Sequence, residues 1–388
     1  MATASPDVET EVESSPTTFS LKSGPTFSKY EKMTEGTRLF AGPEIGRIKE
    51  WVAMEKIHGA NLSLTVWSKG GEKKREGEGG KRQDVGVKIA RRNDYLKDGE
   101  QFFGLDRQPE LLMALHTSAV KLWDLMNDDE TTPTPQSITI YGELFGGYYP
   151  HPSIPPLPNM ISIQKEVAYS PDLKFCSFDI AVNNGNDKNY MNYDDAMSLF
   201  EGAGFMYSRP LITGTMEEVF NYELGFPSTI PAIFGLPPID GNLAEGIVIK
   251  PLKDSTLITR KGPKRLIFKR KIEKFSERRA LPRPENHLTS TREDEKWKGT
   301  KGDEIKYEIT ALITDQRVLN AITKIGQPVT KGEWEKIKTE LVADVRDTLK
   351  EENEELIKDC DDVLMMNEIK KQCGIFIQQY KKRPKTNF

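Results

Sequence analysis

One stretch decides the fold of this chain: it reads EKIHGAN and spans residues 55–61. Strand-forming residues flank it on both sides, and Gly59 lets another stretch of backbone approach closely. The amine of Lys56 can therefore be held rigidly in a site, where a lysine can act as a nucleophile. Lysine is more often a solvated surface residue, and short strings recur by chance, so this interpretation needs partners elsewhere in the sequence.

The composition is that of a soluble globular protein, and 388 residues are enough for two domains with separate cores. No apolar run is long enough to cross a bilayer, so we expect no membrane partner. The three cysteines, Cys176, Cys360 and Cys373, are odd in number and far apart, which favours neither disulfides nor zinc. We therefore expect a reducing intracellular compartment, cytoplasmic or nuclear.

Four segments differ in composition. Residues 1–24 are acidic, rich in Ser, Thr and Pro, and wrongly charged for a transit peptide, so we expect disorder there. Residues 25–280 show short alternating stretches that predict an α+β domain with antiparallel sheets. A charged linker is expected at 281–299, followed by a small all-helical domain over 300–388.

Within the α+β part, periodicity indicates the individual elements. The expected strands lie at 51–67, 85–89, 137–143, 174–182, 244–250 and 265–271, and the expected helices begin at Pro109 and span 193–201 and 216–222. Residues 68–84 are rich in Gly, Lys and Glu and are expected to form a flexible loop. In the helical part, Thr330 with Glu333 fits a capping box.

Two further strings place polar and aromatic groups on expected strands. In YGEL at 141–144, Glu143 lies beside glycine at a strand end, where it can accept hydrogen bonds from a ribose; a plain turn is the alternative. In FCSFDI at 175–180, alternation puts Asp179 on one face and Phe178 on the other. Phe178 could stack on a base, although an aromatic strand residue is more often core.

The fourth string, AEGIVIK at 244–250, is followed by FKRK at 268–271. Because side chains alternate along a strand, Lys269 and Lys271 share one face, where like charges repel unless an anion lies between them. A nucleotide phosphate would be that anion, and a solvated basic face is the alternative. These cations, with a metal near Glu245, would offset the charge that develops when a lysine amine attacks an α-phosphate.

Together these strings resemble the ATP-dependent RNA ligases of the RNA ligase 2 family, which includes a phage ligase and the kinetoplastid editing ligases. The similarity is carried by WVAMEKIHGAN (51–61), ARR (90–92), YGE (141–143), FDI (178–180), AEGIVIK (244–250), KRK (269–271) and KFSE (274–277). It runs from about Tyr30 to Glu277, and more weakly through the helical tail. It implies a nucleotidyltransferase (adenylyltransferase, ATP-grasp-like) domain followed by a helical domain.

The resemblance also implies a role for each site residue. Lys56 would be adenylylated by ATP, and Glu245 would help to position Mg²⁺ or Mn²⁺. The other implied roles are adenine binding by the backbone of Glu55 and by the ring of Phe178, cofactor binding by Ile57, ribose binding by Glu143, α-phosphate binding by Lys269 and Lys271, contact with the AMP phosphate or the RNA end by Arg92, and support from Asn61 and Asp179. The helical tail would engage RNA ends rather than serve adenylylation.

The implied reaction joins 3′-OH and 5′-phosphate RNA ends through a lysyl-AMP enzyme and an adenylylated RNA 5′ end, in RNA repair or editing. The implied partner is RNA, with a nicked duplex as the expected form, and we expect a monomer. The chain departs from the family at Ala60, where members often carry Thr, and at Met54, where the phage member has Arg. The loss of those polar groups could shift the affinity for RNA.

Three alternatives remain open at this point. DNA ligases and mRNA-capping guanylyltransferases share the lysine chemistry but attach an OB-fold, whose short strands differ from the helical periodicity found here. A catalytically inactive RNA-binding scaffold would tolerate the loss of charged site residues, all of which are present. The P-loop signature does not occur, so we expect no fused kinase that prepares RNA ends.

Overall fold

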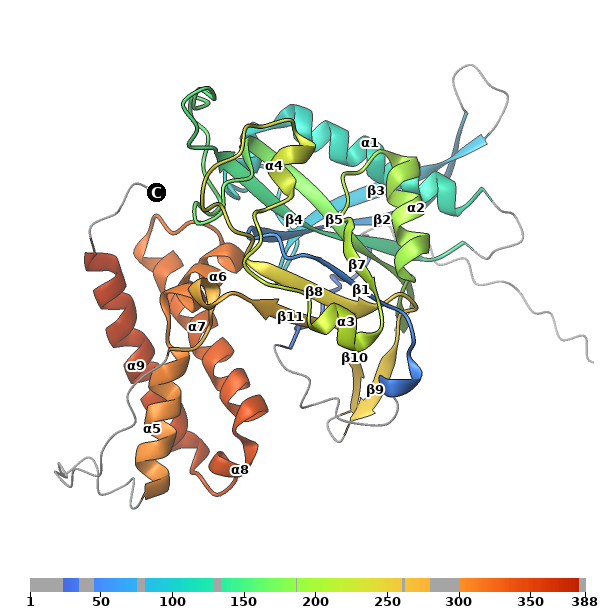
Figure 1. The fold of residues 1–388 in the computed structure, drawn as a ribbon. Coiled ribbons are helices and arrows are strands. Elements are labelled where there is room, and N and C mark those ends of the chain that lie inside the picture. Colours follow the sequence, from blue (N-terminus) through green and yellow to red (C-terminus); the bar gives the residue numbers. More distant parts are fainter. Residues whose placement is uncertain are drawn as a thin grey trace, which may run out of the picture.

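The computed structural model describes residues 24–34, 45–74, 81–128, 134–185, 187–259, 262–279 and 300–383. The expected disordered segment at 1–24 and the expected linker at 281–299 lie outside these ranges, apart from Gly24. Figure 1 shows a β-rich half beside a bundle of helices that is formed by the last part of the chain. The fold is therefore α+β, as the sequence predicts.

Two antiparallel sheets and a projecting hairpin form the β-rich half. The four-stranded sheet has the order β11-β8-β1-β7, with β1 at Trp51–Glu55, β7 at Pro210–Gly214, β8 at Gly246–Pro251 and β11 at Phe268–Lys271. The five-stranded sheet has the order β3-β2-β4-β5-β6, with β2 at Ala60–Lys74, β3 at Lys81–Arg91, β4 at Ser137–Tyr148, β5 at Ser170–Asn184 and β6 at Asp187–Tyr190. The hairpin pairs β9 (Thr256–Thr259) with β10 (Gly262–Arg265).

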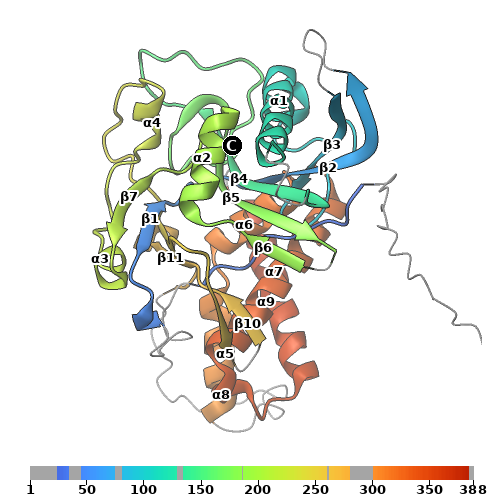
Figure 2. The same ribbon diagram turned by 90° about the vertical axis from the view of Figure 1, so that its right-hand side faces the viewer.

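Four helices of the described residues pack against the sheets. The helices of this half are α1 (Pro109–Met126), α2 (Tyr193–Ala203), α3 (Met216–Phe220) and α4 (Ile230–Ile233), with 3-10 turns at Ile45–Arg47, Leu105–Arg107 and Glu273–Phe275. Both α1 and α2 pack on the five-stranded sheet, where Trp123 and Phe200 are buried against Leu62 and Leu64. In Figure 2, these two helices lie on one side of β4 and β5, which leaves the other side for the helical bundle.

The expected strand 51–67 is in fact two strands, β1 and β2, which belong to different sheets. Lys56 lies in the crossing between them, where its backbone N–H donates to Gly246 O at 2.9 Å. Gly59 is required at this crossing, because a Cβ on it would lie 2.3 Å from the Leu144 carbonyl oxygen. The two close backbone contacts thus fix Lys56 between the sheets.

Two other expectations about strands are wrong. Residues 68–84 are not a free loop where they are described, because β2 and β3 extend across them and pair Glu72 with Gln83. A backbone ladder needs no apolar side chains, so a polar composition does not exclude a strand. The last expected strand is also two, β10 and β11, because Leu266 and Ile267 between them pack into two different apolar clusters.

The last part of the chain, residues 300–383, is a helical bundle with its own core. Its helices are α5 (Thr300–Leu312), α6 (Asp315–Ile325), α7 (Lys331–Glu352), α8 (Glu354–Ile357) and α9 (Asp362–Lys382). Leu341, Val345 and Cys373 are among its fully buried residues. The Thr330 hydroxyl accepts from the Glu333 N–H at 3.2 Å, so the expected capping box at the start of α7 is confirmed.

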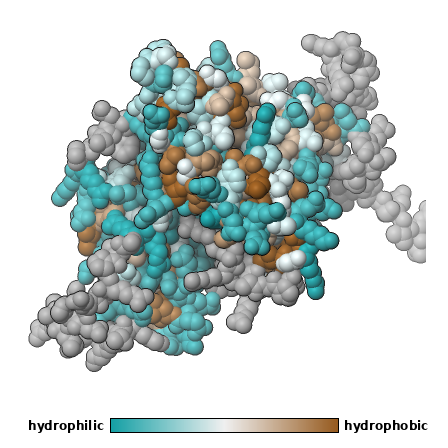
Figure 3. Space-filling view, viewed as in Figure 1, coloured by the Kyte–Doolittle hydropathy of each residue, from teal (hydrophilic) through white to brown (hydrophobic). Residues whose placement is uncertain are grey.

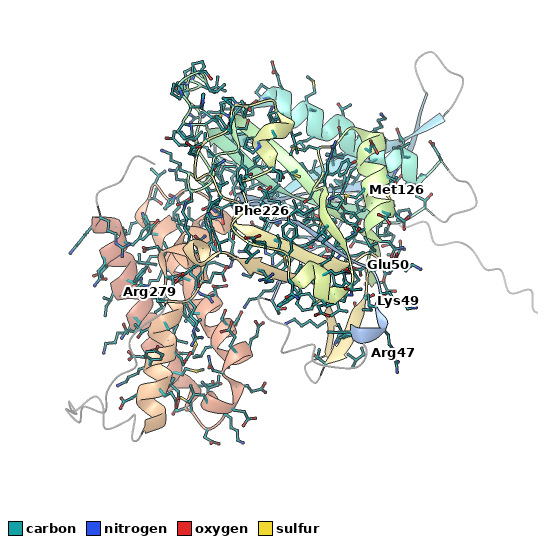
Figure 4. All side chains as sticks on the ribbon, viewed as in Figure 1. Arg47, Lys49, Glu50, Met126, Phe226 and Arg279 are labelled. Carbon is teal, nitrogen blue, oxygen red and sulfur yellow. The ribbon has the colours of Figure 1, made fainter. Side chains whose placement is uncertain are left out.

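The helical bundle contacts the β-rich half through α5, α6 and α7, the last by a hydrogen bond from Asn93 to Glu340 at 3.3 Å. Arg317 Nε donates to Glu277 O at 2.9 Å, and the N–H of Arg279 donates to Ala311 O at 2.8 Å. In Figure 4, Arg279 marks the region where the chain passes from one half to the other. Figure 3 shows hydrophilic residues over much of this face, with hydrophobic groups in separate patches, the larger ones over the β-rich half. Among the described helices, none is long and apolar enough to span a membrane.

We predict that Leu341→Ala lowers the free energy of unfolding by about 2–5 kcal/mol, because it leaves a cavity in the core of the helical bundle. The control on the same helix is Glu335→Ala, whose side chain is 65% exposed. It should change the free energy of unfolding by less than about 0.5 kcal/mol. Urea unfolding followed by circular dichroism measures both, and equal effects would contradict the core assigned here.

Candidate active site

A cavity of about 640 Å³ lies between the sheets and the helical bundle. Its walls come from both sheets (β1, β8 and β11 of one, β2, β4 and β5 of the other), from the segment 29–33, and from α6 and α7. It is lined by every residue that the sequence assigns to a site: Glu55, Lys56, Ile57, Asn61, Arg92, Glu143, Phe178, Asp179, Glu245, Lys269 and Lys271. The structure therefore brings the predicted set together, and the individual roles remain predictions.

The carboxylate of Glu245, directly before β8, lies at the centre of this set. Its Oε2 accepts a hydrogen bond from Lys56 Nζ at 2.8 Å and lies 3.2 Å from His58 Nδ1. Its Oε1 lies 2.9 Å from Lys271 Nζ. Burial alone would raise the pKa of Glu245, but the charges of Lys271, Lys56 and His58 outweigh burial and hold this pKa well below its usual value. Glu245 is therefore an anion that aligns the Lys56 amine.

His58 belongs to this cluster, although the patterns that locate the other site residues do not single it out. The ring is buried, and its Nε2 lies 3.4 Å from Glu166 Oε2 on the side away from Glu245. Burial lowers the pKa of His58, but the charges of Glu245 and Glu166 raise it more, so the net shift is upward. His58 thus contacts Glu245 from within the cluster, and its place two residues after Lys56 is the one signal that could have indicated it.

Lys269 and Lys271 share one face of β11, as strand alternation predicts, and a carboxylate lies between them. Glu277 Oε1 accepts from Lys269 Nζ at 2.8 Å and from Lys271 Nζ at 2.6 Å. Burial would raise the pKa of Glu277, but these two lysines hold it well below its usual value. Arg270 points to the other face, where it donates to Tyr222 O at 3.2 Å. The sequence predicts an anion between the two lysines, and in this structure that anion is the carboxylate of Glu277.

Phe178 and Asp179 both line the cavity, which strict alternation along a strand does not allow. A bulge in β5 sets Tyr141 opposite Asp179 and Gly142 opposite Ser177, so that Phe178 is the extra residue. The expectation that the two side chains face opposite sides of the sheet is therefore wrong. The bulge is what brings an aromatic ring and a carboxylate from neighbouring positions to the same wall.

Asp179 anchors the wall behind Phe178 through buried charges. Its Oδ2 accepts from Arg265 Nη1 at 2.9 Å and from the Tyr30 hydroxyl at 2.5 Å, and its Oδ1 pairs with Lys250. Burial would raise the pKa of Asp179, but Arg265 and Lys250 hold it well below its usual value. Tyr30 in turn packs edge-on against Phe178, with ring centroids 5.1 Å apart. This arrangement fits a supporting role for Asp179.

Glu55 holds a neighbouring loop with its side chain. Its carboxylate accepts from the Ser228 hydroxyl at 2.6 Å and from the Thr229 N–H at 2.7 Å. Burial raises the pKa of Glu55, although these hydrogen bonds oppose the shift. Because the carboxylate is occupied in this way, the backbone of Glu55 is the part left for the adenine contact that the sequence predicts.

Arg92, Asn61 and Glu143 form another wall of the cavity. Arg92 Nη2 donates to the carbonyl oxygen of Glu31 at 3.2 Å, and Asn61 Nδ2 donates to Gly142 O at 3.4 Å. Burial raises the pKa of Glu143 to about 7, against the opposing charges of Lys56 and Arg92. The segment 29–33, from which Glu31 comes, is an element of the site for which the sequence offers no local signal.

A divalent metal would depend on Glu245. Within the described ranges, no group of three or more His, Cys, Asp and Glu side chains is arranged to hold a metal ion. Mg²⁺ is commonly bound by one or two carboxylates together with the phosphates of a substrate. Glu245, the carboxylate that contacts the Lys56 amine, fits that mode of binding, in which the nucleotide would complete the coordination.

Comparison with known proteins assigns the chain to a family. The family profile described as RNA ligase matches residues 49–271, and the profile described as T4 RNA ligase 2 C-terminal matches residues 298–374. RNA-editing ligase 2, mitochondrial, of Trypanosoma brucei brucei is 31% identical over 339 residues, which cover 78% of this chain and 77% of the relative. RNA-editing ligase 1, mitochondrial, of the same organism is 27% identical and covers 78% and 70%. The chain therefore belongs to the RNA ligase family.

Solved structures of a Naegleria gruberi RNA ligase are also similar to this chain. A variant of that ligase with ATP and Mn is 15% identical and has a TM-score of 0.37. The same ligase with PPi has a TM-score of 0.36. In both cases the match covers 65% of this chain and 58% of the Naegleria chain, so this chain spans less than two thirds of that ligase.

We predict that Glu143→Gln stabilises the protein more at about pH 8 than at about pH 5. Because the pKa of Glu143 is raised from 4.5 to about 7, folding favours its neutral form. The contribution of this neutral carboxyl group to the free energy of unfolding is fully present below about pH 4.5 and is lost as the pH rises through about 7. Glutamine stays neutral, so the advantage of the variant should grow across this range, by at most about 1.4 kcal/mol for each pH unit.

Urea unfolding at a series of pH values measures this effect. The control is Thr117→Ala, at an exposed position of α1, which removes no ionisable group, so that its difference from wild type should not change with pH. A difference for Glu143→Gln that is equally independent of pH would contradict the environment assigned to this carboxyl group.

Proposed function

We propose that this protein is an ATP-dependent RNA ligase that joins RNA 3′-OH and 5′-phosphate ends through a lysyl-AMP intermediate. The observation that carries the proposal is the Lys56 amine, held by Glu245 at 2.8 Å in a cavity that also contains the Lys269 and Lys271 pair. The membership of the RNA ligase family supports it. ATP, with Mg²⁺ or Mn²⁺, is the proposed cofactor set.

The proposed reaction has three steps: adenylylation of the enzyme, adenylylation of the RNA 5′ end and formation of the phosphodiester. In the first, the uncharged Lys56 amine attacks the α-phosphorus of ATP: a P–N bond forms, the P–O bond to pyrophosphate breaks, and the proton released from the nitrogen passes to solvent. In the second, the P–N bond breaks as AMP passes to the 5′-phosphate of the RNA, and the lysine is restored. In the third, the RNA 3′-OH attacks that phosphate, so that a phosphodiester forms and AMP leaves.

The residues of this chain position the first step. Glu245 and His58 orient the amine, while Lys269 and Lys271 present two cations where negative charge develops on the phosphate. A divalent metal near Glu245 would supply further positive charge to the phosphates. Phe178 and Glu143 offer a stacking surface and a hydrogen-bond acceptor for the adenosine part.

The proposal extends to the form of the RNA, the oligomeric state and the compartment. Relatives named RNA-editing ligases support RNA as the partner, and we propose a nicked duplex as its form and a monomer as the active species. All three cysteines are free thiols, which supports a reducing compartment, cytoplasmic or nuclear. The trypanosome relatives are named mitochondrial, which makes an organelle the alternative.

The alternatives from the sequence are less well supported. The segment after β11 is helical from α5 to α9 and matches the profile of a T4 RNA ligase 2 C-terminal region. A DNA ligase or a capping enzyme would carry an OB-fold there. An inactive scaffold would not need the Lys56 amine to line the cavity beside Lys269 and Lys271.

We predict that Lys56→Ala abolishes the covalent, acid-labile AMP adduct and the sealing of RNA ends, because it removes the nucleophile. The wild type, incubated with labelled ATP, GTP or NAD and run on a denaturing gel, should retain label from ATP alone. Lys49→Ala, at an exposed position before β1, is the control and should keep the adduct. Mass spectrometry that places AMP on another lysine, or label retained from GTP, would refute the proposal.

We predict that Lys269→Ala and Lys271→Ala each slow self-adenylylation by about 100-fold or more, the scale expected when a group that stabilises transition-state charge is removed. Arg270→Ala, on the opposite face of the same strand, should slow it far less. Single-turnover rates with ATP measure the three variants, and thermal melting confirms that each is folded. Wild-type rates for either lysine variant would disprove its phosphate-binding role.

A further inference from the structure

Glu277 occupies the position in which the two lysines of β11 would hold a phosphate. One oxygen, Oε1, is shared by Lys269 Nζ at 2.8 Å and Lys271 Nζ at 2.6 Å. The residue is 8% exposed and lines the same cavity as Lys56. A carboxylate and a phosphate are both anions that bind lysine ammonium groups, so they would compete for this pair.

Glu277 is also joined to the helical bundle. Asn320 Nδ2 donates to the same Oε1 at 3.1 Å, and Arg317 Nε donates to the Glu277 carbonyl oxygen at 2.9 Å. The Nη1 of Arg317 lies 3.9 Å from Oε2, just inside the range of an ion pair, and is paired with Asp344 on α7. Arg317 is therefore close enough to pair with the Glu277 carboxylate when a phosphate binds the two lysines.

We propose that Glu277 is a positioning residue that competes with the nucleotide phosphate for Lys269 and Lys271, and that its transfer to Arg317 couples nucleotide binding to the helical bundle. The proposal rests on the proposed function, because Lys269 and Lys271 must be the pair that binds the phosphate. It deepens that function by making the charge of Glu277 a determinant of nucleotide affinity.

The physical reason is the cost of a buried, unpaired charge. When a phosphate takes the two lysines, the buried carboxylate of Glu277 loses its closest cations and must find another partner. Arg317 is the cation already in contact with it, and a stronger contact would alter the pairing between Arg317 and Asp344. By reciprocity, whatever Arg317 does to stabilise the displaced carboxylate strengthens nucleotide binding to the same extent.

The test is the affinity of the full-length protein for α,β-methylene-ATP, an analogue that cannot transfer AMP, measured by calorimetry. Glu277→Gln removes the competing charge and should bind the analogue at least about fivefold more tightly, the lower end of typical coupling between sites. Arg317→Gln removes the alternative partner and should bind it more weakly. In the double variant, the effect of Arg317→Gln should disappear, because no carboxylate then needs that partner.

Two further variants separate this coupling from a loss of structure. Glu277→Asp keeps the charge and should bind the analogue less tightly than Glu277→Gln. Glu308→Gln removes one of two carboxylate partners of Arg278, a contact with the bundle one residue from Glu277 that does not line the cavity, and should leave the affinity within about twofold of wild type. A purely structural role for Glu277 would weaken binding in every Glu277 variant.

Unchanged or weaker binding by Glu277→Gln would overturn the inference, as would equal effects of Arg317→Gln with and without Glu277. If Arg317→Gln does not fold, the comparison of Glu277→Gln with Glu277→Asp still decides the question. Wild-type adenylylation of Lys56 is measured alongside: its absence would refute the proposed function, whereas its presence with unchanged affinities would refute the coupling alone.

Discussion

The site depends on one buried carboxylate, Glu245, that faces two lysine amines and a histidine ring. A buried ion costs several kcal/mol unless it is fully paired, and Glu245 is paired with Lys56, His58 and Lys271. Lys56 and His58 lie in the crossing between β1 and β2, and Lys271 lies at the end of β11. The need to pair Glu245 therefore holds the start of β8 against these two segments. The same contacts point one amine into the cavity. Structural stability and the nucleophile therefore rest on the same set of charges.

A second buried carboxylate completes the charge balance before a nucleotide binds. Glu277 lies between the two lysines of β11 and also touches Asn320 of the helical bundle, so the phosphate-binding side of the cavity is shared by both halves of the molecule. The helical bundle thus contributes residues to the site and is not a separate domain without contact to it. This arrangement explains why residues of α6 and α7 line a cavity whose chemistry comes from the strands.

Local patterns could be predicted from the sequence because they depend on neighbouring residues. The shared face of Lys269 and Lys271 follows from strand alternation, and the close approach at Gly59 follows from the lack of a side chain. The bulge at Phe178 could not be predicted, since it depends on the register with β4. Glu166 and Arg317 reach the cluster only through tertiary packing, and the polar strands of the β2–β3 hairpin carry no apolar alternation at their far ends.

The most direct measurement is a crystal structure of the protein after reaction with ATP. We expect AMP bonded to Lys56 Nζ, with Lys269 and Lys271 on the oxygens of its phosphate and the carboxylate of Glu277 moved from them toward Arg317. AMP on a different residue, or a phosphate that leaves both lysines bound to Glu277 as they are now, would contradict this mechanism.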